Sequence, residues 1–326
     1  MSFKNITNQE HIINFLRASL KSNRVAGSYL FIGQEGKEKE KLAKEFAKLL
    51  NCQEALSMDS CDECLVCKKI DEEKLVDVHW YRSENNSVVI SQVRDLEKYM
   101  YLRPYEAKYK VFVICDAQSL TEEASNALLK TLEEPKRDSI LILIATDESK
   151  LLPTISSRCQ KLVFNALDEM KIKDILIKEH NLPLLQAHLI SYLAEGSLDR
   201  ALSYKDLKDD LFEKRQHILN AIYFKKFSIY KMEEFDIKDS KEKRKSLNIL
   251  LDMLLSWFRD LLVLKSGLDT PLINIDKKEE LKKINIDYSK DDILNNISTI
   301  SNTKSMLGLN VNVKLAFSKM RADLWK

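Results

Sequence analysis

The amino-acid sequence predicts an α/β protein, in which a parallel β-sheet covered by helices on both faces is followed by an all-helical C-terminal half. Continuous apolar segments in the first half, such as KVFVICD and SILILIAT, alternate with amphipathic segments. This alternation is typical of buried parallel strands and the helices that cover them. Beyond Ala166 the sequence indicates only helices. The chain also has only 6 glycines and 5 prolines in 326 residues, too few for the many tight turns of an all-β protein.

Hydrophobic periodicity and capping residues place the elements of the first half in order. Ser91 and Thr121 are suitable N-caps for two of the helices. Helices are expected within 1–27, from about Lys39, over 91–102 and over 121–132. Strands are expected at 28–32, 76–81, 87–90, 110–116, 139–146 and 160–164.

The chain length suits two or three domains. We expect the sheet domain to span 1–165, with a cysteine-rich insertion at 52–67. Residues 166–206 are predicted to form a small helical unit. Residues 207–326 are predicted to form amphipathic helices separated by polar stretches.

Composition and charge exclude several classes of protein. Hydrophobic residues make up 44% and charged residues 31%, as in an ordinary globular chain. The 52 basic and 50 acidic residues give a formal charge of +2, which argues against a polycation that coats nucleic acid. No apolar run approaches the roughly 20 residues of a membrane span, and the N-terminus lacks a signal-peptide core. We therefore expect a cytoplasmic protein without membrane association.

Four of the six cysteines are clustered with the spacing of metal ligands. Cys52 is followed by Cys61, Cys64 and Cys67, so that two C-x-x-C steps share one loop. Four thiolates at about 2.3 Å satisfy tetrahedral zinc and leave no open position for water. The pattern predicts a structural Zn²⁺ site, and reduced free thiols in a loop are the alternative.

The segment after the first strand partly matches a phosphate-binding loop. The active pattern is G-x-x-x-x-G-K-[ST], and here Gly33-Gln-Glu-Gly36-Lys37-Glu38-Lys39-Glu40 keeps the first glycine and the lysine. Glu38 replaces the last glycine, and Glu40 replaces the hydroxyl residue that binds the metal. Both carboxylates would repel a triphosphate. We expect no productive ATP binding, and an unrelated strand-to-helix turn is the alternative.

A second nucleotide-binding element is also incomplete. The strand KVFVICD ends in Asp116, which suits a magnesium contact, but the next residue is Ala117. The acid that orients the attacking water is therefore missing. The sequence predicts a degenerate, inactive nucleotide site formed by Gly33, Gly36, Lys39 and Asp116.

Together these motifs resemble the bacterial clamp-loader family of AAA+ proteins. The resemblance depends on the degenerate loop, the four clustered cysteines, the segment KVFVICDAQSLTEEASNALLKTLEEP and the tripeptide Ser157-Arg158-Cys159. It implies an AAA+ three-layer domain with a zinc insertion, a helical lid domain over 166–206 and a C-terminal oligomerisation (collar) domain over 207–326. It also implies a non-catalytic subunit of the DNA polymerase III clamp loader, which supports ATP-dependent loading of the sliding clamp onto primed DNA.

The resemblance further implies that Arg158 acts in trans, as an arginine finger for ATP held by a neighbouring subunit. A guanidinium is permanently charged and forked, which suits the charge on a transferring phosphoryl group. The implied partners are gamma- or tau-type ATPase subunits and the delta subunit. Primed DNA is expected within the complex, and the sliding clamp is an indirect partner. A surface arginine without this role is the alternative.

Two other arginines are weaker candidates. Active relatives carry a nucleotide-sensing arginine in a Gly-Ser-x-Arg pattern, whereas here Asp199 takes that place and Arg200 is shifted by one residue. One residue rotates a helix by about 100°, so Arg200 is expected to turn away from the nucleotide site. The helix start at Ser91 with Arg94 is implied to contact DNA phosphates. An ordinary capped helix with a solvated arginine is equally open.

Two other functions are alternatives. A self-contained AAA+ ATPase acting in DNA replication or repair would need Lys39 and Asp116 to suffice despite the departures around them. A zinc-ribbon nucleic-acid binder is disfavoured by the near-neutral charge and by the short spacing from Cys61 to Cys67, which leaves no room for a recognition helix.

Overall fold

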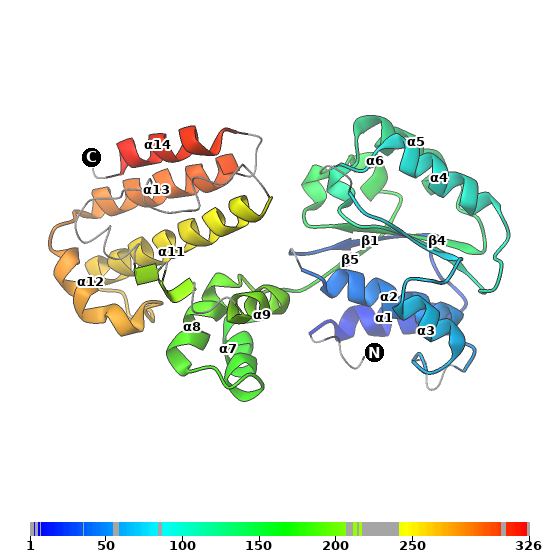
Figure 1. The fold of residues 1–326 in the computed structure, drawn as a ribbon, viewed down its shortest axis with the longest axis horizontal. Helices are drawn as coiled ribbons and strands as arrows, with labels where there is room; N and C mark the ends of the chain where they lie inside the picture. The colour runs from blue at the N-terminus through cyan, green and yellow to red at the C-terminus, as the bar shows by residue number, and fades with distance from the viewer. Residues whose placement is uncertain are drawn as a thin grey trace. The chain divides into compact units, whose positions relative to one another are not determined.

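Figure 1 shows the computed structural model of the chain. It divides into two compact units, Met1–Leu167 and Asp168–Lys326. The predicted division into three domains stays a prediction, and residues 207–210 beside its second boundary lie outside the described residues. The structure describes residues 3, 6, 8–34, 36–54, 59–83, 87–206, 211–213, 215–216, 241–307 and 311–324.

The first unit contains a five-stranded parallel sheet with the strand order β2-β3-β4-β1-β5. Its central strands are buried along their length because helices cover both faces, as their continuous apolar sequences predicted. The strands are β1 (Ser28–Ile32), β2 (Val78–Tyr81), β3 (Lys110–Ile114), β4 (Ser139–Ala145) and β5 (Gln160–Val163).

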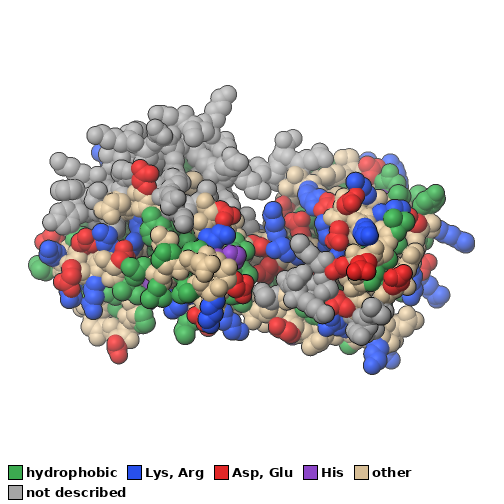
Figure 2. Space-filling model, turned by 60° about the horizontal axis from the view of Figure 1, so that its bottom comes forward, with side chains coloured by type: hydrophobic (Ala, Val, Ile, Leu, Met, Phe, Trp, Pro, Cys, Tyr) green, Lys and Arg blue, Asp and Glu red, His purple; other side chains and the backbone are tan. Residues whose placement is uncertain are grey.

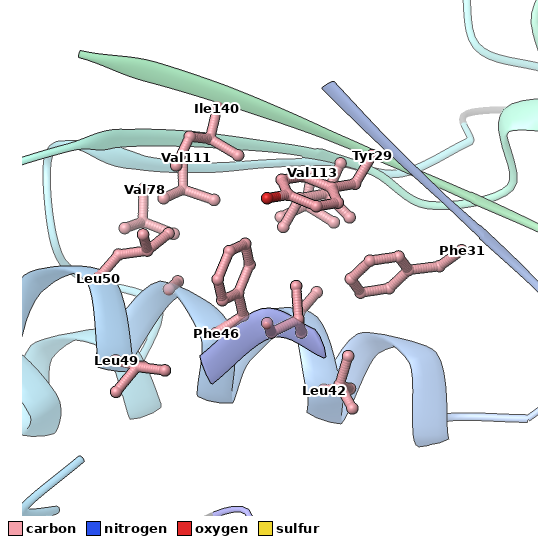
Figure 3. Packing of buried hydrophobic residues seen from close by; sticks show 14 of the residues in the cluster. Tyr29, Phe31, Leu42, Phe46, Leu49, Leu50, Val78, Val111, Val113 and Ile140 are labelled. Carbon is pink, nitrogen blue, oxygen red and sulfur yellow. The ribbon is translucent and has the colours of Figure 1, made fainter. Parts of the chain in front are cut away.

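Helices form a layer on each side of the sheet, as Figure 1 shows. One face is covered by α1 (Glu10–Lys21), α2 (Glu38–Asn51) and α3 (Leu65–Asp71). The other face is covered by α4 (Ile90–Tyr101), α5 (Glu122–Glu133) and α6 (Pro153–Ser156). In Figure 3, Phe46 of α2 points toward Tyr29 of the sheet and Leu50 of the same helix points toward Val78. The rings of Tyr29 and Phe46 meet edge to face at 5.3 Å. The predicted three-layer α/β fold is confirmed.

The start of α4 differs from the prediction. The helix begins at Ile90 with Val89 as its N-cap, so the expected strand over 87–90 and the assignment of Ser91 as the cap are wrong. The Gln92 side chain supplies the capping interaction by accepting a hydrogen bond from the Val89 backbone N–H at 3.1 Å. A single β-bridge between Val88 and Leu120 replaces the strand.

Among its described residues, the second unit contains helices joined by turns and no strand. Its helices are α7 (Glu169–Lys178), α8 (Leu184–Leu193), α9 (Leu198–Asp206), α11 (Lys241–Ser266), α12 (Lys278–Asn285), α13 (Lys290–Leu307) and α14 (Val313–Asp323). The apolar stripe of α11 is buried, and this helix packs against α13. Of the helices in the described ranges, none combines the length and apolar composition that crossing a bilayer requires.

Candidate functional site

The four clustered cysteines converge between α2 and α3. Cys52 directly follows α2, Cys64 is the N-cap of α3, and Cys67 lies in the first turn of that helix. The sulfur atoms of Cys52, Cys61, Cys64 and Cys67 all lie within 4.8 Å of one another. A tetrahedral zinc ion with Zn–S bonds of about 2.3 Å sets its sulfur atoms about 3.8 Å apart. The cysteines therefore fit the predicted ion with little adjustment.

Backbone N–H groups also point at these sulfur atoms. Cys61 N lies 3.4 Å from the Cys52 sulfur, and Cys64 N lies 3.2 Å from the Cys61 sulfur. Hydrogen bonds of this kind stabilise an ionised acceptor such as a thiolate. The donor set, four sulfurs held by local backbone, has the chemistry of a closed structural zinc site.

A buried lysine joins the cysteine-rich loop to the sheet domain. Lys48 of α2 is fully buried, and its ammonium lies 2.8 Å from Asp62 in the loop and 2.8 Å from Asp71 at the end of α3. It also lies 3.1 Å from Glu45. Burial alone would lower the pKa of Lys48, but hydrogen bonds to Asp62 and Asp71 outweigh it and raise the pKa. Sequence reasoning missed this residue, although a lysine between inward-facing apolar residues was a usable signal.

In the loop after β1, the Lys39 side chain binds the backbone of the loop itself. The ammonium of Lys39 is buried and donates hydrogen bonds to the carbonyl groups of Gly33, at 2.9 Å, and Gln34. Glu40 lies 3.3 Å from the guanidinium of Arg82, a residue that sequence reasoning did not select. Gly36 is half-buried in the same loop. Lys39 thus contacts the Gly33 carbonyl directly, and the assignment of Gly33, Gly36 and Lys39 to a degenerate nucleotide site stays a prediction.

Gly33 has a packing role that needs no phosphate. A Cβ atom at this position would lie only 2.7 Å from the Cβ of Phe164, which follows β5. Contacts this short are not tolerated between carbon atoms. The first glycine of the loop is thus required by the fold itself.

Asp116 lies at the carboxyl end of β3 in the left-handed conformation, with φ 60°. Its carboxylate accepts a hydrogen bond from the Ser83 hydroxyl at 3.3 Å. The following residue, Ala117, is buried in the core between the sheet and α4–α6. A carboxylate there would be forced into an apolar environment, which is costly for a charge.

Arg158 follows α6 and is exposed, and two groups hold its guanidinium. One terminal nitrogen, Nη2, lies 2.9 Å from Glu133 Oε1, and the other, Nη1, donates to the Thr154 carbonyl at 3.0 Å. The next residue, Cys159, packs against the core, and burial raises the pKa of its thiol to about 12. Arg158, and not the thiol of Cys159, is thus the charged group of this tripeptide.

Arg158 and the loop at 33–40 lie toward opposite ends of the parallel strands. Because β1 and β5 are parallel with Tyr29 paired to Gln160, Arg158 precedes the level at which β1 begins its pairing with β5. Gly33 follows the carboxyl end of β1. The four residue steps from Tyr29 to Gly33 correspond to about 13 Å of strand. The arginine is thus separated from this chain's own loop.

The other two predicted arginines have their own local surroundings. Arg200 in the second unit is held by Glu195 at 2.6 Å and by the Tyr204 hydroxyl at 3.2 Å. Ser91 and Arg94 are exposed in the first two turns of α4. Figure 2 brings the α1–α3 side of the first unit forward, and basic and acidic side chains are interspersed on that side.

Comparisons with known proteins cover both halves of the chain. A family model described as "DNA polymerase III, delta subunit" matches residues 8–168, and one described as "DNA polymerase III, delta subunit, C terminal" matches residues 209–323. The chain is similar to DNA polymerase III subunit delta' of Bacillus subtilis (strain 168), with 30% identity over 311 residues. These residues cover 94% of this chain and 93% of the relative.

Two further similarities involve related subunits. DNA polymerase III subunit tau of Bacillus subtilis (strain 168) is 30% identical over 321 residues, which cover 90% of this chain and 57% of the relative. Among solved structures, a gamma-subunit-related protein of Thermotoga maritima aligns with a TM-score of 0.42 and 18% identity. That alignment covers 95% of this chain and 97% of the other chain.

Proposed function

Because this chain belongs to the delta-prime family of DNA polymerase III clamp-loader subunits, we propose that it supports ATP-dependent loading of the sliding clamp onto primed DNA without turning over ATP itself. Similarity to the delta-prime relative along nearly the whole of both chains carries this proposal. Its similarity to tau favours an assembly with gamma- or tau-type ATPase subunits, and the delta subunit is the other expected neighbour. In this assembly the chain would contact primed DNA within the complex and the sliding clamp only indirectly.

The proposal that this chain does not turn over ATP is supported by the contacts of the loop at 33–40. The Lys39 ammonium, which contacts phosphates in an active loop, instead donates to loop carbonyl groups. Glu40 replaces the hydroxyl residue that would bind the metal, and Ala117 supplies no acid to orient water. Triphosphate binding would have to displace the lysine and tolerate an added carboxylate.

Arg158 is proposed to act in trans, on ATP held by the neighbouring ATPase subunit. This part of the proposal is supported by the location of Arg158 toward the amino-terminal ends of the strands, away from the loop that follows β1. An exposed guanidinium at that end is available to another subunit and not to its own loop. It would stabilise charge on the transferring phosphoryl group.

The test is the DNA- and clamp-stimulated ATPase activity of a reconstituted loader that carries Arg158→Ala in this chain only. We expect a loss of roughly 100-fold or more, the usual contribution of an arginine finger. Lys161→Ala removes a nearby exposed cation and should leave the rate unchanged. Unchanged activity of Arg158→Ala would leave a purely structural subunit. ATP turnover by the isolated chain would favour the self-contained ATPase.

The four cysteines are proposed to hold a structural Zn²⁺ ion. When bound, the ion cross-links the end of α2, the following loop and the start of α3. The convergence of four sulfur atoms supports this assignment. Catalysis by the metal is not part of the proposal, because four thiolates fill its coordination shell.

A further inference from the structure

We propose that Glu133 is a positioning residue for Arg158. This inference rests on the proposed action of Arg158 in trans. Glu133 is the last residue of α5, and its Oε1 atom lies 2.9 Å from Nη2 of Arg158. The two residues are separated by the whole of β4 and α6 in sequence, so their contact is produced by the fold.

The backbone on both sides of this contact is firmly anchored. Leu132, next to Glu133, is 5% exposed, and Ile155, three residues before Arg158, is fully buried in the same hydrophobic core. The Arg158 backbone N–H donates to the Ile155 carbonyl at 3.1 Å. Helices α5 and α6 lie side by side in Figure 1 and pack against each other. The two exposed side chains therefore extend from a rigid base.

The geometry leaves Arg158 able to bind a phosphate while it remains paired. A guanidinium has five N–H donors. Glu133 and the Thr154 carbonyl each engage a different terminal nitrogen, and each of these contacts needs only one N–H group. Three donors therefore remain for the oxygen atoms of a transferring phosphoryl group. Glu133 orients the long side chain without competing for the donors that would perform the chemistry.

Holding the Arg158 guanidinium in one orientation before it meets the transferring phosphoryl group should accelerate the reaction. A free arginine side chain has many rotamers, and fixing one of them at the moment of reaction costs entropy. The Glu133 contact fixes the guanidinium beforehand. Because the pair is exposed, its contribution should be modest compared with that of the arginine itself.

The experiment measures steady-state ATPase activity of the reconstituted loader, with substitutions in this chain only. We expect Glu133→Ala to lower kcat about two- to fivefold, the range that an exposed ion pair supplies, and to leave the KM for ATP unchanged. Glu133→Gln retains an acceptor oxygen and should recover part of the loss. Glu134→Gln removes the adjacent exposed carboxylate and should match the wild type.

The same substitution in an Arg158→Ala background separates a positioning role from a structural one. If Glu133 acts through Arg158, Glu133→Ala should have no further effect there. An equal loss in both backgrounds, an unchanged kcat, or an increase in kcat would overturn the inference. If Arg158→Ala alone had no effect, the proposed action in trans would fail instead, so the two failures are distinguishable.

Discussion

Lys48 shows how one residue can fix the position of a whole insertion. Its side chain is fully buried, yet it carries a charge that is costly to remove from water unless it is paired. Asp62 and Asp71 supply the pairing from the cysteine-rich loop and from the end of α3. Burial raises the pKa of Glu45 to about 7, although the charge of Lys48 opposes the shift. The lysine is thus a polar link between α2 and the cysteine-rich loop.

Replacing Lys48 should loosen that segment. Lys48→Met leaves the acidic partners without their cation, which costs about 3 kcal/mol when one member of a buried pair is removed. Amide hydrogen exchange in α3 should then become roughly 100-fold faster, if this helix opens locally. Lys98→Met, which removes an exposed cation paired with Asp95, should change exchange little. Unaltered protection of α3 in Lys48→Met would contradict the role assigned to Lys48.

The candidate residues were predictable from sequence to different degrees. The four cysteines were recognisable because their spacing itself encodes a shared site. The contacts of Lys48 and Glu133 were not, because their partners are brought close only by tertiary packing. Gly33 matches the first glycine of a phosphate-binding loop. The structure shows that packing against Phe164 also requires a glycine here, and sequence alone could not distinguish the two reasons.

At the scale of elements, burial on both faces made the central strands easy to predict. β1, β3 and β4 lie between two helical layers, so each is hydrophobic at every position after its first residue, which is Ser28, Lys110 or Ser139. The start of α4 was harder, because a glutamine inside the helix provides the capping interaction and the N-cap is a valine. Valine is a poor N-cap, so residue preference pointed to Ser91 instead.

Removing the proposed zinc ion should affect the cysteine-rich insertion more than the sheet. The sheet is held by hydrophobic cores on both faces, whereas the described residues 59–63 around Cys61 contribute no side chain to either core. We expect Cys64→Ser to lower the bound zinc from one ion per chain and to expose 52–67 to proteolysis. Cys159→Ser, a change outside the cluster, should retain the metal. Full zinc content in Cys64→Ser, measured by metal analysis after dialysis, would disprove the assigned ligand set.

At the scale of the whole molecule, the separation of Arg158 from the loop at 33–40 matters for the proposed assembly. The loop follows the carboxyl end of β1, and Arg158 lies toward the opposite end of the strands of the same parallel sheet. In the proposed assembly, such a subunit would contribute Arg158 to a neighbour's nucleotide site while its own loop takes no part in the chemistry. The fold would then need no ATP of its own to hold Arg158 in place.

The stability of the isolated chain should therefore not depend on ATP. A nucleotide bound with a Kd of about 10 µM would, at about 1 mM, add about 2.7 kcal/mol to the free energy of unfolding. Such a gain raises Tm by roughly 5 °C or more. We expect no change in the Tm of this chain with MgATP, because Lys39 is engaged by the carbonyl groups of Gly33 and Gln34. A gamma- or tau-type ATPase subunit under the same conditions is the positive control. A rise in Tm that Lys39→Ala abolishes would show that the loop does bind nucleotide.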